Sequence, residues 1–330
     1  MRKILFALAL LSSAPALADA KIDPAAAVPE VFAMEAIGAP DLKPVRPGSL
    51  QTALTDLRGI VKDGRWNPGF ALEVSPWELG QGASVGWDKY AENAMWLRSS
   101  LSVATVGNAD PAGAGARGAL ALRVRIQDDA DWRLNKPFLA CADAKLKSAL
   151  DALPPPPEPG TSTVTSPAVA PRPDYASCLD EVAWNADQAA FAAAGTFAST
   201  SSALSDTRAD GFVAWFGASR GIGKHVQLVG NLKYHYYRAI PAAAALHQAS
   251  VALRGEYKAK YFGVAADAGY GPAFQSGNVS HRGLFGIVAH VRVAETSYAE
   301  VGLQDDLDWS AGTGKLSITS NFKLSFAIPR

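Results

Sequence analysis

The strongest constraint on the fold is the alternation of apolar and polar residues in the last segment of the chain, residues 316–328. Its apolar positions recur at every second residue except Ser320, and they are Leu316, Ile318, Phe322, Leu324, Phe326 and Ile328. A period of two indicates a β-strand with one apolar face and one polar face. A soluble sheet turns the apolar face toward a protein core, whereas a transmembrane barrel turns it toward lipid. The fold depends on which environment receives that face.

The same alternation recurs through the chain and predicts about ten strands, within a range of about eight to twelve. They are expected at residues 69–77, 95–105, 118–127, 209–219, 226–238, 247–258, 260–270, 282–293, 297–305 and 315–328. The predicted fold is all-β: an antiparallel, up-and-down transmembrane β-barrel. A secreted all-β sandwich or a closed soluble barrel is the alternative.

Residues 1–20 are expected to form a signal peptide. Arg2 and Lys3 precede an apolar run, which ends at a small-residue cleavage site, Ala16-Leu17-Ala18 or Ala18-Asp19-Ala20. This leader predicts export, and with the barrel it predicts the outer membrane of a Gram-negative bacterium. The 31 basic and 31 acidic residues balance, so the net charge gives no reason to expect a nucleic-acid partner.

Residues 21–68 are expected to form a periplasmic arm or a plug in the barrel mouth, with a helix near residues 50–61. The barrel is expected to take residues 69–330, with a long insertion at residues 128–208 whose centre is rich in proline. Alanine-rich pieces at residues 140–153 and 178–194 are predicted to be helical. Each contains one cysteine, and we expect a Cys141–Cys178 disulfide to close the insertion at its base.

A succession of residues near the start of the mature chain resembles the opening of bacterial outer-membrane barrels that have no assigned chemistry. It comprises Pro29, Phe32, Gly38, Arg46-Pro47, Gly69-Phe70-Ala71-Leu72-Glu73 and Pro76-Trp77. The resemblance covers residues 29–77 and implies a location and a fold class. It implies no activity.

The predicted connections favour a membrane barrel over a sandwich. If the mature amino terminus is periplasmic, the connections after odd-numbered strands are extracellular, at residues 78–94, 128–208, 239–246, 271–281 and 306–314. Those after even-numbered strands are mostly short: residues 220–225, 259 and 294–296, with residues 106–117 as the exception. Long outer loops, short inner turns and an even strand count are typical of outer-membrane barrels.

Charged residues in the middle of strands are expected to line the lumen, because a charge on a lipid-facing position is costly. The expected lining residues are Arg123, Arg125, Lys233, Arg254, Glu256, Asp267, Arg282, His290, Arg292, Glu300 and Lys323. Cations outnumber acids in this set. A conducting lumen of this composition is expected to prefer anions.

A short acidic motif occurs twice, as Gln127-Asp128-Asp129-Ala130-Asp131-Trp132 and as Gln304-Asp305-Asp306-Leu307-Asp308-Trp309. In the predicted topology both copies lie at the outer ends of strands. The carboxylates of Asp129, Asp131, Asp306 and Asp308 could then bind calcium at the rim, because calcium prefers several oxygen ligands. Asp128, Asp305 and His281 could form a hydrolytic site. The alternative is that the acids and the tryptophan mark the exit of a strand from the membrane.

The expected function is a small outer-membrane pore or a scaffold that displays loops, with the lipid bilayer as its partner. Two alternatives remain open. One is a surface hydrolase that uses the rim aspartates and histidines. The other is an interaction module that binds a protein through residues 21–68 or 128–208.

Overall fold

The computed structural model contains a single large antiparallel sheet of eleven strands and a small two-stranded hairpin. It describes residues 26, 31–39, 42–75, 77, 79, 86–107, 115–152, 175, 177–178, 184–238, 245–259, 261–275, 278–294, 297–309 and 312–324. The predicted signal peptide and the last six residues lie outside this part. Among the described residues, no helix is long and apolar enough to cross a membrane.

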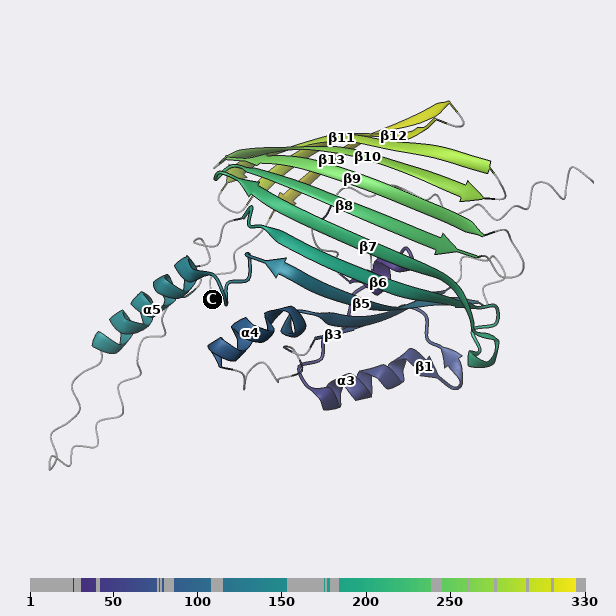
Figure 1. Cartoon of the computed structure of the whole chain (residues 1–330), viewed down its shortest axis with the longest axis horizontal. Coiled ribbons are helices and arrows are strands. Elements are labelled where there is room, and N and C mark those ends of the chain that lie inside the picture. Colours follow the sequence, from purple (N-terminus) through teal and green to yellow (C-terminus); the bar gives the residue numbers. More distant parts are fainter. Residues whose placement is uncertain are drawn as a thin grey trace, which may run out of the picture.

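The eleven strands follow one another in the sheet in the order of the sequence, so the sheet is a simple up-and-down meander (Figure 1). They are β3 (Phe70–Val74), β4 (Ser100–Gly107), β5 (Ala116–Asp128), β6 (Gln188–Ser199), β7 (Arg208–Ile222), β8 (Val226–Tyr237), β9 (Leu246–Lys258), β10 (Phe262–Gln275), β11 (Asn278–Ala294), β12 (Ser297–Asp308) and β13 (Thr313–Leu324). No pairing joins β3 to β13 in the described part, so the sheet is open. With eleven alternating strands, β3 and β13 run in the same direction.

Strand β6 corrects the prediction of a helix at residues 178–194, and it lies inside the predicted insertion. The predicted second strand is also corrected, because residues 95–97 belong to helix α4 (Trp87–Leu97). One additional strand reverses the direction of every strand after it. The predicted long connections therefore lie at opposite ends of the sheet: residues 75–99 and 129–187 at one end, and residues 238–245, 276–277 and 309–312 at the other.

We name the two ends by the connections they carry. The disulfide end holds the connections at residues 75–99, 129–187, 223–225, 259–261 and 295–296, and the far end holds the others. Each end combines longer and shorter connections. The predicted alternation of long outer loops with short inner turns is therefore wrong. The eleven described strands fall within the predicted range of eight to twelve, although their number is odd.

The sheet is strongly curved, so that β12 and β13 lie behind the middle strands in Figure 1. Helix α2 (Phe32–Ala36) packs against β4, β5 and β6 on this same side. We call this side the inner face and the opposite side the outer face. The backbone N–H of Ala33 donates to Ser102 Oγ (3.3 Å), which satisfies one donor at the start of the helix.

Helix α3 (Leu50–Leu57) and the hairpin of β1 (Val61–Lys62) and β2 (Arg65–Trp66) lie beside β3 (Figure 1). Ser49 caps α3, because its hydroxyl oxygen accepts from the N–H of Thr52 (3.1 Å). A short 3-10 turn, residues 58–60, follows the helix. The predicted helix at residues 50–61 is thus confirmed in its first two turns.

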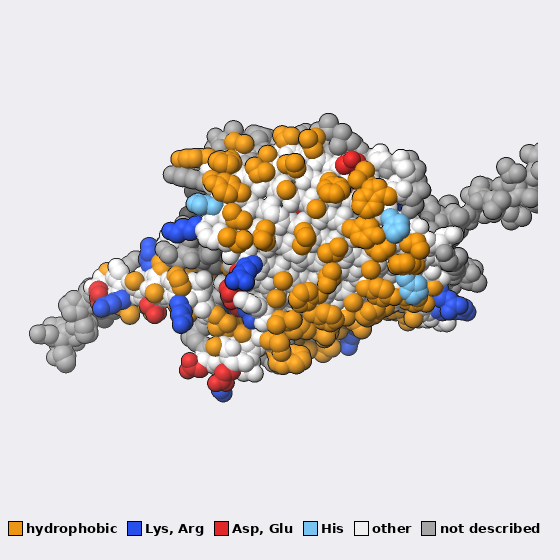
Figure 2. Space-filling view, turned by 45° about the horizontal axis from the view of Figure 1, so that its top comes forward, with side chains coloured by type: hydrophobic (Ala, Val, Ile, Leu, Met, Phe, Trp, Pro, Cys, Tyr) orange, Lys and Arg blue, Asp and Glu red, His pale blue; other side chains and the backbone are white. Residues whose placement is uncertain are grey.

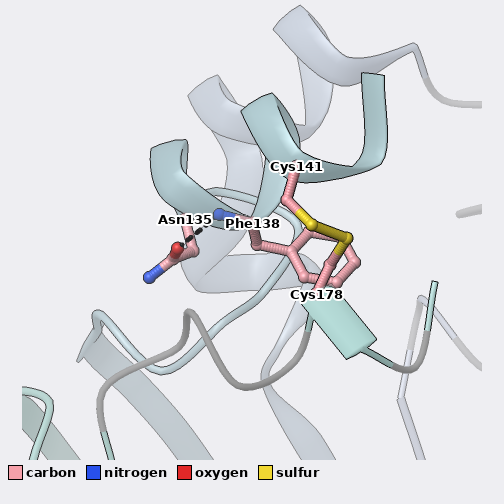
Figure 3. The surroundings of a disulfide bond; sticks show 4 residues. All are labelled: Asn135, Phe138, Cys141 and Cys178. Atoms are coloured by element: carbon pink, nitrogen blue, oxygen red, sulfur yellow. Dashed lines mark hydrogen bonds between the residues drawn. A yellow bond between two sulfur atoms is a disulfide. The ribbon is translucent and has the colours of Figure 1, made fainter. Parts of the chain in front are cut away.

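Helix α5 (Lys136–Asp151) begins in the connection between β5 and β6. Asn135 caps it by accepting from the N–H of Phe138 (2.9 Å), and Phe138 is buried beneath the disulfide between Cys141 and Cys178 (Figure 3). The predicted disulfide is confirmed. It links α5 to the chain that returns toward β6.

Candidate functional site

The inner face carries the charged residues that the sequence predicts for a lumen. Pairing partners such as Ser100 with Arg123, and Arg254 with Asp267, are opposite one another in the register and therefore share a face. Of the predicted lining residues, Arg123, Arg125, Lys233, Arg254, Glu256, Asp267 and Arg282 follow this alternation. The register gives residues 290, 292, 300 and 323 equivalent positions. Their side chains lie outside the described part.

Glu73 is the centre of a buried ion cluster on the inner face of β3, β4 and β5. Its Oε1 accepts from Arg123 Nη2 (2.7 Å) and from Ser100 Oγ (2.8 Å), and its Oε2 accepts from Arg46 Nε (3.0 Å). Glu73 and Arg123 are both buried, whereas Arg46 is about half exposed. The cluster ties three strands to the amino-terminal segment.

Other inner-face cations also meet acids, which lowers the net positive charge that the sequence suggests for this face. Arg125 Nη1 lies 2.8 Å from Asp128 Oδ2, and Arg254 Nη1 lies 3.7 Å from Asp267 Oδ2. Lys233 on β8 reaches Glu35 on α2, with Nζ 2.9 Å from Oε1. Glu35 and Asp128 thus add negative charge to the inner face. The alternation of residues within strands did not identify either of them.

Helix α2 fills the inner side of β3–β7 with apolar contacts. Its Phe32, Ala33 and Met34 are buried with a layer of small side chains on the sheet. That layer consists of Ala71, Ala104, Ala119, Ala121, Ala190, Ala192 and Ala194, with Val213 and Trp215 at one side. Alanines allow the helix to approach the strands closely, because no longer side chain occupies the space between them. This half of the inner face is therefore packed.

Another ion pair lies on the inner side at the far end. Arg117 Nε donates to Asp210 Oδ2 (3.0 Å), and the Arg117 guanidinium lies over the Tyr237 ring at 4.6 Å from its centroid. Asp210 is buried, and its backbone carbonyl accepts from the N–H of Arg238 (2.7 Å). The pair fixes the start of β7 to β5 and β8.

At the disulfide end, Asp131 holds helix α4 against the chain that follows β5. Tyr90 Oη donates to Asp131 Oδ2 (2.5 Å), and Arg133 Nη1 lies 3.3 Å from Asp131 Oδ1. The Arg133 guanidinium lies over the Trp77 ring at 4.5 Å. Burial and the Asp131 carboxylate raise the pKa of Tyr90 to about 12. Asp131 thus has a structural role.

A cleft of about 480 Å³ opens beside this cluster, between the end of β5 and the start of α5. Its polar lining includes Arg98, Asp128, Asp129 and Asp131. These acids already have partners: Asp128 accepts from Gln188 Nε2 (2.8 Å), and Asp129 accepts from Gln127 Nε2 (3.0 Å). The cleft is a polar recess whose carboxylates are engaged by the protein itself.

The two copies of the acidic motif lie at opposite ends of the sheet, so the structure does not bring them together. Asp128 ends β5 at the disulfide end, whereas Asp306 and Asp308 lie near the end of β12, at the far end. Asp305 and His281 occupy outer-face positions in the register, opposite Phe285 and Pro272. The hydrolytic site of Asp128, Asp305 and His281 is therefore wrong, and so is a shared calcium site. No group of three or more potential metal ligands occurs among the described residues.

The outer face is apolar and exposed from β4 to β12, and Figure 2 shows the part of it that faces the viewer. From β4 to β12 its exposed side chains include Leu101, Leu122, Phe216, Leu232, Leu253, Phe285 and Leu303. Soluble monomers rarely expose a continuous apolar patch of more than about 300–600 Å². Larger exposed apolar faces mark surfaces that interact with proteins or membranes.

Aromatic and histidine side chains border this face at both ends. The far-end border consists of Tyr234, Tyr236, His247, Tyr270, His281 and Trp309. Within it, Tyr270 Oη and His281 Nδ1 are hydrogen-bonded at 2.7 Å, and Tyr270 stacks on Trp309 with centroids 5.7 Å apart. The disulfide-end border contains His225, Tyr257 and Phe262, whose neighbouring rings lie 5.7–5.9 Å apart.

The comparison of the chain with protein-family models and with curated proteins finds no match.

Proposed function

We propose that the protein is an outer-membrane β-barrel of a Gram-negative bacterium whose lumen is occupied by its own helix α2, and that it serves as a scaffold that displays the disulfide-closed loop. The observation that carries the proposal is the exposed apolar outer face with aromatic residues at both borders. Lipid is the partner that covers such a surface without a matching protein, and interfacial aromatic belts are typical of membrane barrels. The leader predicted at residues 1–20 supports export.

The separation of the two borders supports the same environment. On β9, His247 and Tyr257 both face outward, ten residues apart in the numbering. At about 3.4 Å per residue they are about 34 Å apart along the strand, or about 24–28 Å along the axis of a barrel with strands tilted by about 35–45°. This agrees with an apolar band of about 25 Å in outer-membrane barrels.

The packed inner face favours a filled scaffold over an open pore. Helix α2 and the Glu73 cluster occupy the inner side of β3–β7, and a barrel of this strand number has a narrow interior. A bilayer recording of the purified protein is expected to show no stable conductance. Steady ohmic channels in the wild-type protein would favour the pore, and their ion preference would then test the predicted preference for anions.

Extraction tests the membrane assignment. The mature chain, overexpressed with its leader, is expected in the outer-membrane fraction, and we expect it to need detergent for purification. It should show a folded band that shifts on heating in detergent gels. Recovery of folded protein from the soluble periplasmic fraction would contradict the proposal.

A further inference from the structure

Helix α3 covers the outer side of β3, where the other strands expose their apolar residues. Leu72 of β3 pairs with Val103 and shares its outward position, yet Leu72 is only 1% exposed. Val45 forms a parallel bridge to Leu72, with hydrogen bonds to Ala71 and Glu73, and α3 packs beside it. The edge of the sheet is thus closed by residues 45–57 in place of another strand.

Prolines and an ion pair fix this segment and stop the sheet from continuing. Pro44 and Pro47 flank Val45 and Arg46: Pro44 lacks the N–H on the free edge that another strand would need, and Pro47 lacks the N–H that would continue the pairing with β3. Arg46, between them, is held by Glu73. A further strand therefore cannot pair regularly along this edge, and α3 forms the surface there.

The surface that α3 presents is an apolar stripe. Leu50, Leu54 and Leu57 are 58%, 54% and 41% exposed. Their spacing of four and three residues places them on one side of the helix. Ala53, on the adjoining side, is 3% exposed and faces the protein. The helix therefore buries a small residue inward and turns its three leucines away from the described protein.

Exposed basic residues follow the stripe directly. Arg58, Lys62 and Arg65 are all exposed in the turn and the hairpin after α3, with Asp63 as the one acid in this stretch. A stripe of leucines beside a basic cluster is the composition of segments that bind at the surface of anionic membranes. The positive charge is complementary to lipid phosphate groups.

We propose that the leucine stripe of α3 is a lipid-contacting surface, which replaces a strand at this edge of the barrel wall, with Arg58, Lys62 and Arg65 directed to anionic headgroups. The inference rests on the proposed membrane location. It adds that the wall is completed on this side by a helix and lipid instead of by hydrogen bonds to β13. Lipid is inferred as the occupant because the leucine stripe is continuous with the apolar outer face.

Fluorescence quenching by brominated lipids tests the stripe. Both native cysteines are bridged, so an introduced cysteine is the only free thiol for a bimane label. The full chain is reconstituted in vesicles of phosphatidylcholine and phosphatidylglycerol with brominated acyl chains. Leu54→Cys is compared with Thr55→Cys, which is exposed on the polar side of α3, and with Leu228→Cys on the outer face of β8.

The expected result is strong quenching at positions 54 and 228, about threefold above that at position 55, because only the first two labels meet acyl chains. Quenching at position 228 without quenching at position 54 would overturn the inference and leave the barrel intact. Absence of quenching at position 228 would contradict the membrane barrel itself. The Arg58→Gln, Lys62→Gln, Arg65→Gln variant should lower the enrichment of labelled phosphatidylglycerol around the protein by about half, and an unchanged enrichment would refute the headgroup contact.

Discussion

Lys233 on β8 and Glu35 on α2 form an ion pair of 2.9 Å that joins residues almost two hundred positions apart. Apart from the hydrogen bond of Ala33 N–H to Ser102 Oγ, the helix packs on β3–β7 through apolar contacts, so the Lys233–Glu35 pair is its polar attachment to the next strand. Both side chains are partly exposed. The pair is therefore suited to adjust how firmly α2 is held, because a partly exposed ion pair contributes only about 1 kcal/mol.

Replacing Lys233 with Met is expected to loosen α2 without unfolding the sheet. A loss of about 1 kcal/mol raises the population of the displaced helix about fivefold. The measurement is the rate at which a maleimide labels a cysteine introduced at Ala33, which is fully buried when α2 is docked. Arg254→Met, which alters a different inner-face pair, is the control. Equal labelling rates in all three backgrounds would show that Lys233 does not hold the helix.

Replacing Glu73 with Leu is expected to destabilise the protein by about 3–5 kcal/mol, because it removes the buried carboxylate that pairs with the buried Arg123 guanidinium. The double variant Glu73→Leu, Arg123→Met should recover most of that loss, since no buried charge remains unpaired. Guanidinium unfolding in detergent micelles measures both effects. Arg46→Ala is the control, with an expected loss of about 1 kcal/mol or less, because Arg46 is 52% exposed. A small loss of stability in the Glu73→Leu variant would show that Arg123 is solvated.

The raised pKa of Tyr90 predicts a loss of stability at alkaline pH. The phenol ionises near its ordinary value of about 10 in the unfolded chain and near 12 in the folded protein. Its contribution is therefore complete below pH 10 and is lost as the pH rises through 12. Tyr90→Phe should be less stable than the wild type at pH 8 and should lose part of the alkaline slope. Identical slopes in the two proteins between pH 10 and 12 would contradict the assignment.

Removing the disulfide is expected to loosen the displayed loop and leave the sheet folded. Only Phe138 of helix α5 is buried, so the Cys141–Cys178 link supplies much of its attachment. In the Cys141→Ser, Cys178→Ser protein, trypsin should cleave after Lys145 and Lys147 about tenfold faster or more. A disulfide that closes a loop of this size stabilises the folded state by a few kcal/mol, and the variant lacks that stabilisation. The heat-modifiable band should persist. Unchanged cleavage would show that other contacts hold the helix.

The faces of the sheet could be predicted from sequence, whereas one strand could not. Alternation in residues such as Leu253 and Arg254 gives the outward and inward positions directly, and the register agrees with it. The sequence of β6 predicts a helix because it is rich in alanine, which favours helices. Ala190, Ala192 and Ala194 are small because α2 packs on them. The requirement for small side chains on β6 thus comes from α2, about 160 residues earlier in the chain, and the local pattern of β6 does not contain it.

The missed strand also explains why the candidate rim site failed. Each strand reverses direction, so one strand fewer places Asp128 and Asp308 at the same end, although the structure separates them by the length of the sheet. The two motifs are similar in sequence only. Asp131 binds Tyr90, an interaction that strand periodicity cannot reveal because Tyr90 belongs to helix α4, most of which lies in the predicted connection at residues 78–94.

The most direct test of the account is the environment of consecutive residues on β9. Side chains at odd positions from 247 to 257 face outward and those at even positions from 248 to 256 face inward, by the register with β8 and β10. Spin labels at each position, in reconstituted bilayers, report their accessibility to molecular oxygen and to a water-soluble nickel reagent. The account predicts a period of two, with high oxygen accessibility at Val251 and Leu253. Low accessibility to both reagents at Val251 and Leu253 would place these residues in a dry protein core and contradict it.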